Sequence, residues 1–480
     1  MGLAQALASL QVHLSNLRLL SEMAAIAAAG FQPVPNLHVL PLLTSIRTAL
    51  GGGLFFTLSV GAGLAILAAA AGALAANESL RRGRILTAAA LLWALGVLSI
   101  NADGFNLWAS LYLLLIPPPV FAMAWVSLRR ERPAWRLLLL TRALPVALLA
   151  LGWSTQYDPH LFSDLRDHLL MSNPAGERVS SFYYRYTLYA AEAFKSRRQK
   201  QLNAVRISPG PVDSRRMQVA QALIRSDWLP VASAAALVID VDAQEGRLRF
   251  SENGKLLADV AIERFLAGPR ALLEQVSDRS DRWAPFRALT FWGVLAAFPV
   301  ALYLLLFALL RLGSGLLAAP RRAELAAAAL CLMAGIGILA AFAADRAGPP
   351  GPQGLAAALA ADAWQTQAAA LRAIHETKTD ICTLPGWQEL EASGRPQVRY
   401  WFAKALAGGR CPEAAAASVR LLADPHLNVR TMALESLAER GDRGAVGRLA
   451  AFVVDSRDWY DQLYAYRALR ALGWTQTGAP

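Results

Sequence analysis

The sequence predicts an α-helical integral membrane bundle of about six spans, with a soluble α+β insert and a C-terminal α-solenoid. Apolar residues make up 55% of its 480 residues and charged residues only 17%, whereas about 25% of residues are charged in soluble proteins. Long apolar segments alternate with short basic connections, and similar helical segments recur near the C-terminus. We expect an N-terminal amphipathic helical segment (1–50), four transmembrane helices (51–153), a periplasmic α+β insert (154–287), two transmembrane helices (288–345), a Pro/Gly linker (346–356) and a repeat domain (357–480).

Six apolar segments are the candidate spans, because a helix rising about 1.5 Å per residue needs roughly 20 residues to cross a bilayer. Any one of them alone is compatible with a buried helix of a soluble protein, but the set of six predicts a membrane bundle. The second and the fourth are the shortest. The segments are residues 52–76, 85–100, 107–128, 137–153, 288–310 and 323–344.

Arginines lie in every second connection between these segments. Because Arg and Lys favour the cytoplasmic side of a membrane, the three basic connections are expected inside. The connection 101–105 contains only Asp103 and is expected outside, together with the insert, the C-terminal region and the first 50 residues. The net charge is +12, but no nucleic-acid recognition motif accompanies it, so we expect no nucleic-acid partner. The arginines are Arg81, Arg82, Arg84, Arg129, Arg130, Arg132, Arg136, Arg311, Arg321 and Arg322.

Three consecutive prolines, Pro117, Pro118 and Pro119, lie within the third span. Proline removes a backbone donor and clashes with the preceding turn, so we expect a kink whose freed carbonyls are satisfied by neighbouring helices or water. Broken spans are typical of transporters. No Asp, Glu or Lys lies near the middle of a span, however, and Arg142 is the one interior charge. A subunit of a transporter or channel is therefore the second hypothesis for the function.

The N-terminal segment contains a leucine stripe with spacings of four and three residues. This spacing predicts an amphipathic helix with one apolar face. We favour a helix that lies on the membrane or packs on the protein's own body, and a docking helix for another subunit is the alternative. The stripe consists of Leu3, Leu7, Leu10, Leu14 and Leu17.

The insert is predicted to run from helix to strand and back to helix. Asn-Pro and Gly at 173–176 separate two helical stretches, and turn residues separate three short strands that form a meander. The predicted helices are residues 159–172, 177–199 and 262–276, and the predicted strands are residues 237–241, 247–250 and 255–259.

His160, Asp164 and His168 recur every four residues in the first helix of the insert. Imidazole and carboxylate groups are natural zinc ligands, which makes these three the candidates for a metal site or for a membrane enzyme with its active site on the insert. Two helical turns span about 12 Å, however, so all three cannot reach one ion without unwinding. We favour a solvated face with His–Asp pairs, and we expect no metal and no cofactor.

The stretch 180–189, SSFYYRYTLY, concentrates aromatic residues on one predicted helix. Phe182, Tyr186 and Tyr189 share a face, and we expect this face to pack on the strand meander. A membrane-surface belt is the alternative, since tyrosine is enriched at membrane interfaces. The residues left over are candidates for a partner-binding face, because a tyrosine ring is apolar and its tip is polar. They are Tyr183, Tyr184 and Arg185.

Segments of similar sequence recur in the C-terminal region with offsets of 31 and 32 residues. The pattern D-P-x-x-x-V-R-x-x-A-x-x-S-L occupies 424–437, and the third copy has Asp461-Gln462 where the others have Val-Arg, as expected of a terminal repeat. The copies are residues 397–409, 428–441 and 461–473, with a degenerate first copy at 365–376.

This pattern resembles bacterial HEAT-like repeats, a class of short helical hairpins. The resemblance covers about a quarter of the chain and implies a protein-interaction solenoid rather than a reaction. It makes Arg399 and Arg430, which follow the repeated valine, further candidates for partner binding. Cys382 and Cys411 lie in turns one repeat apart, and we expect a disulfide between them if this domain lies outside the cytoplasm.

No nucleotide-binding glycine loop and no HExxH or GxSxG motif in a suitable setting is present. We therefore expect a non-catalytic scaffold or accessory subunit of a bacterial inner-membrane complex. Its multi-pass bundle would lie in the lipid bilayer, and its periplasmic repeats would bind one or more protein partners.

Overall fold

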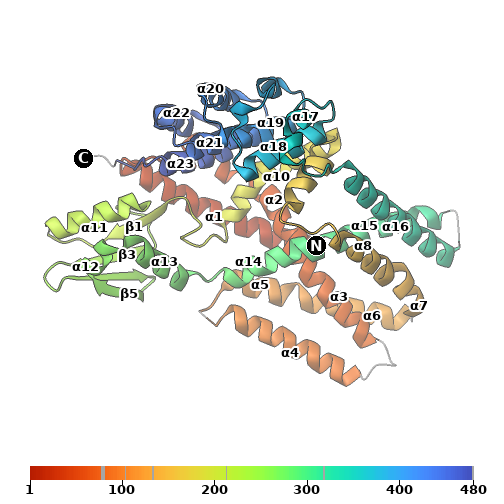
Figure 1. Ribbon diagram of the computed structural model, residues 1–480. Coiled ribbons are helices and arrows are strands. Elements are labelled where there is room, and N and C mark those ends of the chain that lie inside the picture. The colour runs from red at the N-terminus through yellow and green to blue at the C-terminus, as the bar shows by residue number, and fades with distance from the viewer. Residues whose placement is uncertain (77–81, 103, 132–134, 212, 317–318, 478–480) are drawn as a thin grey trace.

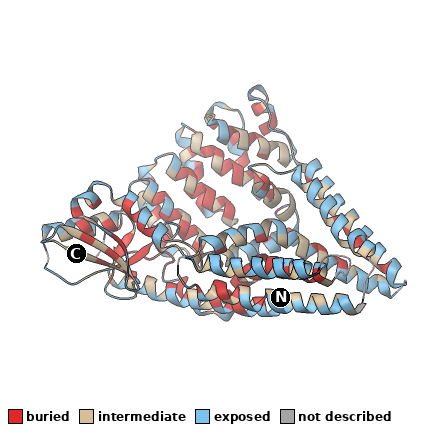
Figure 2. Ribbon diagram, turned by 90° about the horizontal axis from the view of Figure 1, so that it is seen from below, coloured by how far each residue is buried: buried red, intermediate tan, exposed pale blue. Residues whose placement is uncertain are grey.

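A splayed bundle of long apolar helices, an α/β lobe and a stack of short C-terminal helices make up the structure (Figure 1). It is a computed structural model that describes residues 1–76, 82–102, 104–131, 135–211, 213–316 and 319–477. Arg81, Asp103 and Arg132, which we used to orient the spans, lie outside the described residues. Figure 2 shows that exposed residues dominate the long helices, whereas buried residues gather in the C-terminal stack.

Within the described part of the chain, six helices are long and apolar enough to cross a membrane, one at each predicted position. The first and fifth are 31 and 32 residues long, which is more than the roughly 20 residues that a bilayer requires. The spans are α2 (Ile46–Phe56), η2 (Thr57–Gly61) and α3 (Ala62–Ala76); α4 (Arg82–Ile100); α5 (Leu107–Leu115) and α6 (Pro117–Glu131); α7 (Trp135–Leu138), η3 (Leu139–Ala143) and α8 (Leu144–Ser154); α14 (Ala284–Trp292), η5 (Gly293–Ala297) and α15 (Phe298–Gly315); and α16 (Pro320–Asp345).

The spans form two groups of three. Helix α3 packs on α4 and α6, and α16 packs on α8 and α15. The first and fifth spans cross between the groups at the π-helical turns η2 and η5. Glycine is required at this crossing, since a Cβ at Gly293 would lie 2.6 Å from the carbonyl oxygen of Ser59. Small residues thus set the closest helix approach, as is usual in membrane bundles.

The third span is interrupted where the prolines lie. Helix α5 ends at Leu115 and α6 begins at Pro117. Pro117 cannot donate to the carbonyl of Leu113, four residues earlier. The indole nitrogen of Trp93, from α4, instead donates to that carbonyl at 2.8 Å. A neighbouring helix therefore satisfies a polar group that proline leaves free.

Helix α1 (Gly2–Ala28) packs on α2, but the leucine stripe is not its main packing face. Leu7 is buried, whereas the other four leucines of the stripe are exposed. The helix packs on the protein's own body, as we expected, but mainly through another face than the stripe. The face of α1 opposite the stripe packs on glycines of α2, because only small side chains allow the two helices to approach so closely. The buried residues on α1 include Ala4, Ala8, Ser9, Val12 and Asn16.

The insert contains a five-stranded mixed sheet with the order β2-β1-β3-β4-β5. The predicted meander is present as β3, β4 and β5, which pair antiparallel. The strands β1 and β2 were not predicted. β1 pairs parallel with β2 and with β3, and helix α11 connects β1 to β2. The elements are β1 (Asn203–Ile207), α11 (Ser214–Arg225), β2 (Trp228–Pro230), β3 (Leu237–Asp242), β4 (Arg247–Glu252), β5 (Lys255–Ala261), α12 (Ile262–Ala267) and α13 (Pro269–Ser280).

The first helices of the insert lie apart from this sheet. They are α9 (Leu161–Asp164), the π-helical turn η4 (Leu165–Leu170) and α10 (Pro174–Glu192). Helix α10 contacts α1, α2, η4 and the last helix of the chain. Our expectation that its aromatic face packs on the strand meander was wrong, because the sheet packs its own core with α11, α12 and α13.

The C-terminal stack has two layers. Helices α18, α19, α21 and α23 pack side by side in that order, and they coincide with the four predicted repeat copies. Shorter helices form the second layer. The helices are α17 (Leu355–Leu359), α18 (Trp364–Thr377), η7 (Ile381–Thr383), η8 (Trp387–Ala392), α19 (Pro396–Ala405), η9 (Leu406–Gly408), α20 (Pro412–Arg420), η10 (Leu421–Ala423), α21 (Leu427–Glu439), η11 (Arg443–Ala445), α22 (Val446–Asp455) and α23 (Trp459–Ala471).

Candidate functional site

The layer formed by α18, α19, α21 and α23 faces the rest of the protein and is docked on it. At one end, the buried carboxylate of Asp164 binds the guanidinium groups of Arg372, from α18, at 2.9 Å and of Arg346, just after the last span, at 2.6 Å. Arg346 also binds Asp158 at 2.5 Å. Burial acts to raise the pKa of Asp158, but the hydrogen bond and charge of Arg346 outweigh it, so this pKa lies below its ordinary value.

The two candidate histidines bind in the same region but at separate places. The imidazole of His168 lies 2.6 Å from the carboxylate of Asp345, at the end of the last span, and its ring packs on Trp364. His160 lies 3.4 Å from the carboxylate of Glu376, in α18. The three predicted metal candidates therefore each contact a different partner in the C-terminal part. Our interpretation of a solvated face with internal His–Asp pairs was wrong.

Asp167, which is also buried, joins η4 to the second repeat helix. Its carboxylate accepts a hydrogen bond from the indole of Trp401 at 2.9 Å. The amide of Gln397 donates to the backbone carbonyls of Asp167 and Met171 at 3.2 and 2.9 Å. The guanidinium of Arg166 lies 3.7 Å from the ring centre of Tyr400. Hydrogen bonds and a cation–π contact thus fix α19 on the turn that leaves the fourth span.

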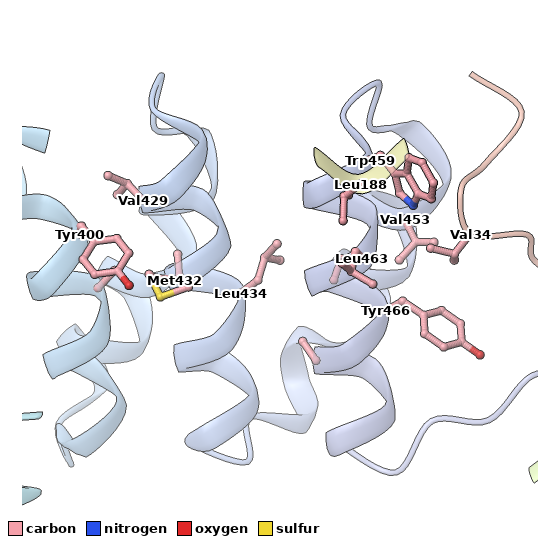
Figure 3. Packing of buried hydrophobic residues seen from close by; sticks show 14 of the residues in the cluster. Val34, Leu188, Tyr400, Val429, Met432, Leu434, Val453, Trp459, Leu463 and Tyr466 are labelled. Atoms are coloured by element: carbon pink, nitrogen blue, oxygen red, sulfur yellow. The ribbon is translucent and has the colours of Figure 1, made fainter. Parts of the chain in front are cut away.

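Helix α10 extends this docked surface with apolar contacts. Leu188 lies beside Trp459 in α23, as Figure 3 shows, and both are buried. Tyr189 packs edge to face on Trp459 with ring centres 5.1 Å apart, and burial raises the pKa of Tyr189 to about 12. The C-terminal end of the aromatic stretch, Leu188 and Tyr189, is therefore core between the insert and the repeats, whereas Phe182 is exposed.

The three aromatic-stretch residues predicted to bind a partner are not equally accessible. Tyr183 and Arg185 are exposed, whereas Tyr184 is partly buried. Tyr184 packs on Tyr183 and on Tyr460, each with ring centres 5.4 Å apart. The surface that these residues form is therefore shared between α10 and α23.

The connection after α1 holds the far end of the stack. The buried side chain of Asn36 donates to the carbonyls of Val453, Val454 and Ser456 at 2.8 to 3.0 Å. Its backbone N–H donates to the side chain of Gln462 at 2.8 Å. Val34 lies beside Val453 (Figure 3). The N-terminal segment thus covers the last repeat.

Asp461-Gln462, the pair that departs from the repeat pattern, is explained by these contacts. Gln462 holds Asn36, and Asp461 binds Arg430 of the preceding repeat at 2.8 Å. Arg399 binds Asp424 in the same way at 2.6 Å. Arg399 and Arg430 therefore link successive repeats, and partner binding at these two residues stays a prediction.

The α/β lobe docks on the same helix through one acidic residue. Asp227, in the turn before β2, accepts hydrogen bonds from the hydroxyl of Tyr466 at 2.6 Å and from Arg470 at 2.9 Å. Burial raises the pKa of Asp227, although both partners act to lower it. One face of the stack therefore contacts the exit of the fourth span, helix α10, the N-terminal connection and the sheet.

Cys382 and Cys411 form a disulfide, with their Cα atoms 6.0 Å apart. The bond ties the turn before the second repeat to the turn after it. Because disulfides persist in oxidising compartments, this bond fits an extracytoplasmic repeat domain. Cys331 is buried in the last span.

A cavity of about 540 Å³ lies between the start of α18 and η8, away from Pro117–Pro119. Apolar residues such as Leu359 and Leu390 line it together with polar ones, including Asp362, Glu389 and Arg395. Among the described residues, no three His, Cys, Asp or Glu side chains are placed to hold a metal ion. The contacts between the repeats and the rest of the chain are ion pairs, hydrogen bonds and apolar packing, which hold these surfaces together.

Sequence reasoning did not single out several of the residues that hold the stack. Arg372, Trp401, Asn36 and Asp227 carry no motif, and each binds a residue more than two hundred positions away. The one sequence signal for these contacts was Asp461-Gln462, which replaces the repeated Val-Arg pair and marks the last repeat as atypical.

The comparisons with known proteins identify the C-terminal repeats alone. Among curated proteins and among solved structures, nothing matches the chain. One family model matches, that of the HEAT repeats, over residues 386–470. HEAT repeats form protein-interaction solenoids, so the C-terminal region of this chain is a HEAT-repeat domain docked on a helical body that contains six candidate membrane spans.

Proposed function

We propose that this protein is a non-catalytic scaffold or accessory subunit of a bacterial inner-membrane complex, which holds a HEAT-repeat domain at the periplasmic surface for a protein partner. The observation that carries the proposal is the docking of the inner repeat layer at both ends, through Asp164 and through Asn36. A repeat domain on a flexible tether would sample many orientations. This one is fixed on the membrane body, which suits a platform that presents a partner in one position.

The docking also limits where a partner can bind. Because the inner layer already contacts the chain itself, a partner needs a surface that this docking leaves open. The edge where α10 meets α23 is such a surface, with Tyr183 and Arg185 exposed beside Tyr184 and Tyr460. Tyrosine and arginine are enriched in protein interfaces, because each combines a large contact area with directional hydrogen bonds.

The test is affinity purification of the full-length protein in mild detergent, followed by mass spectrometry of the co-purifying proteins. We expect one protein to co-purify with the wild type and to be depleted by Tyr183→Ala and Arg185→Ala. Arg448→Ala, an exposed arginine on α22, is the matched control and should retain the partner. A homogeneous species without any partner would contradict the scaffold function, and equal loss with the control would contradict this surface.

The transporter hypothesis rests on the interrupted third span. It requires that the freed backbone groups line a polar cavity in the membrane. The carbonyl of Leu113 is bound by Trp93 instead, which favours a packed helix junction over a binding site at the prolines.

A further inference from the structure

The outer face of α1 is a leucine seam, which we define as Leu3, Leu10, Leu14 and Leu17 followed by Ser21, Ala24 and Ala28. All seven side chains are exposed, and the four leucines have exposed fractions between 39% and 50%. The seam lies opposite the face that packs on α2, where Ala8 and Val12 are buried. Four exposed leucines in a row on one helix are unusual for a surface in water, and such patches mark interaction sites.

Lipid does not account for most of this seam. The first span comprises 31 residues, Ile46–Ala76, and roughly 20 of them, counted back from Ala76 beside the basic connection, cross the hydrocarbon core. The part that precedes Thr57 therefore stands outside the core. A Cβ at Gly53 would lie 2.7 Å from the backbone nitrogen of Ser9, and a Cβ at Gly52 would lie 3.1 Å from Val12. From Leu10 onward, α1 thus lies alongside the part of the span outside the core.

The seam has the geometry of a coiled coil. From Leu10 onward its positions follow each other at alternating spacings of four and three residues, which place knobs in the holes of a second helix. Leu3 lies one heptad before Leu10, and the intermediate Leu7 is buried in the protein itself. The first 17 residues contain no Asp, Glu, Lys or Arg, so two copies can approach along the four leucines of the seam without repulsion between charged side chains. The small residues at the far end, Ala24 and Ala28, keep the helices in close contact there.

The direction of α1 selects the mode of pairing. Its residue Ala4 lies at Gly61 and Val12 lies at Gly52, so α1 runs antiparallel to the first span and close to its axis. Two copies in one membrane are related by a two-fold axis along the bilayer normal. Such an axis leaves two helices that follow the normal parallel to each other, which brings each leucine of the seam opposite its own copy.

We propose that the leucine seam of α1 is a self-association surface, where two copies of this chain form a parallel two-stranded coiled coil above the membrane. This proposal concerns α1 alone and does not depend on the partner of the HEAT repeats.

Single cysteine substitutions in the full-length protein test the proposal in native membranes. Of the native cysteines, two are bonded to each other and the third is buried in the last span. An introduced cysteine is therefore the thiol that reacts. Under mild copper–phenanthroline oxidation, Leu10→Cys and Leu14→Cys should give a product of twice the chain mass. The matched control is Met217→Cys on α11, which is 53% exposed. We expect several-fold more cross-linked product from the seam than from this control.

A seam that cross-links no better than Met217→Cys would overturn the proposal. So would a product of another mass, because a different protein would then cover the seam. Co-expression of differently tagged Leu3→Cys and Leu17→Cys chains tests the direction: parallel helices give few mixed products, and abundant mixed products would contradict the parallel pairing. Glutamate at both Leu10 and Leu14 should convert the dimer to a monomer at unchanged expression, because both side chains are exposed.

Discussion

The carboxylate of Asp164 lies between two guanidinium groups, that of Arg372 in the HEAT-repeat domain and that of Arg346 after the last span. Asp164 belongs to the segment that leaves the fourth span, so three distant parts of the chain meet at one buried carboxylate. The HEAT-repeat domain is held against the bundle of candidate spans at this point.

Replacing Asp164 by Asn should loosen the domain. The change leaves two arginines without their common counter-charge, and breaking a buried pair in this way costs about 3 kcal/mol. We expect a lower unfolding temperature and faster proteolytic cleavage in the Pro/Gly linker 346–356. Glu274→Gln on α13 is the control, because its carboxylate is 41% exposed and pairs with an exposed arginine, Arg270, and exposed pairs contribute less than about 1 kcal/mol. Equal proteolysis of both variants would show that Asp164 does not hold the domain.

Removing the disulfide should destabilise the repeats without dissolving them. The bond closes a loop of 29 residues, and a bridge of this kind stabilises a domain by about 2–4 kcal/mol. We expect Cys382→Ser to lower the unfolding temperature, and we expect the intact mass of the wild type to increase by two hydrogens on reduction. Two free thiols at these positions in the native protein would contradict the bond and would weaken the periplasmic placement.

Replacing Asn36 by Ala should free the last repeat. Three backbone carbonyls lose the donor that the Asn36 side chain supplies, and each buried group left unsatisfied costs about 1–3 kcal/mol. We expect faster amide hydrogen exchange in α22 and α23, measured by mass spectrometry. The neighbouring exposed residue provides the control, His38→Ala. Unchanged exchange in α23 of the Asn36 variant would rule out the covering role of the N-terminal connection.

The Asp461 carboxyl should make stability depend on pH. Burial raises its pKa from 3.8 to about 6, although Arg430 acts to lower it. Because the folded value lies above the unfolded one, its stabilising contribution is complete below 3.8 and is lost as the pH rises through about 6. The loss is about 3 kcal/mol, at 1.36 kcal/mol for each pH unit between the two values.

Asp461→Asn cannot titrate and isolates this contribution. The unfolding temperature of the wild type, relative to that of the variant, should fall as the pH is raised from about 4 to about 8. A difference that stays constant over this interval, or that grows with pH, would contradict the raised pKa.

The spans and the repeats could be predicted because their signals are local. An apolar run of sufficient length identifies a span wherever it lies, and all six predicted segments coincide with observed helices. The repeated Val-Arg and Leu positions identify the helices of the stack in the same way, and residues 386–470 match HEAT repeats. The two strands β1 and β2 escaped prediction because they are short and belong to a parallel unit with a helix between them.

The sequence by itself determined that α1 carries a leucine stripe, that the third span is interrupted at its prolines, and that the C-terminal region is a repeat array. Only the tertiary structure decided what these features contact. Asp164 and Arg372 are 208 residues apart, and no local pattern reveals that two such charges meet. On α1, Gly53 and Gly61 admit the small-residue face and leave the leucines outside, because close packing depends on the shape of both surfaces and not on the apolar character of one.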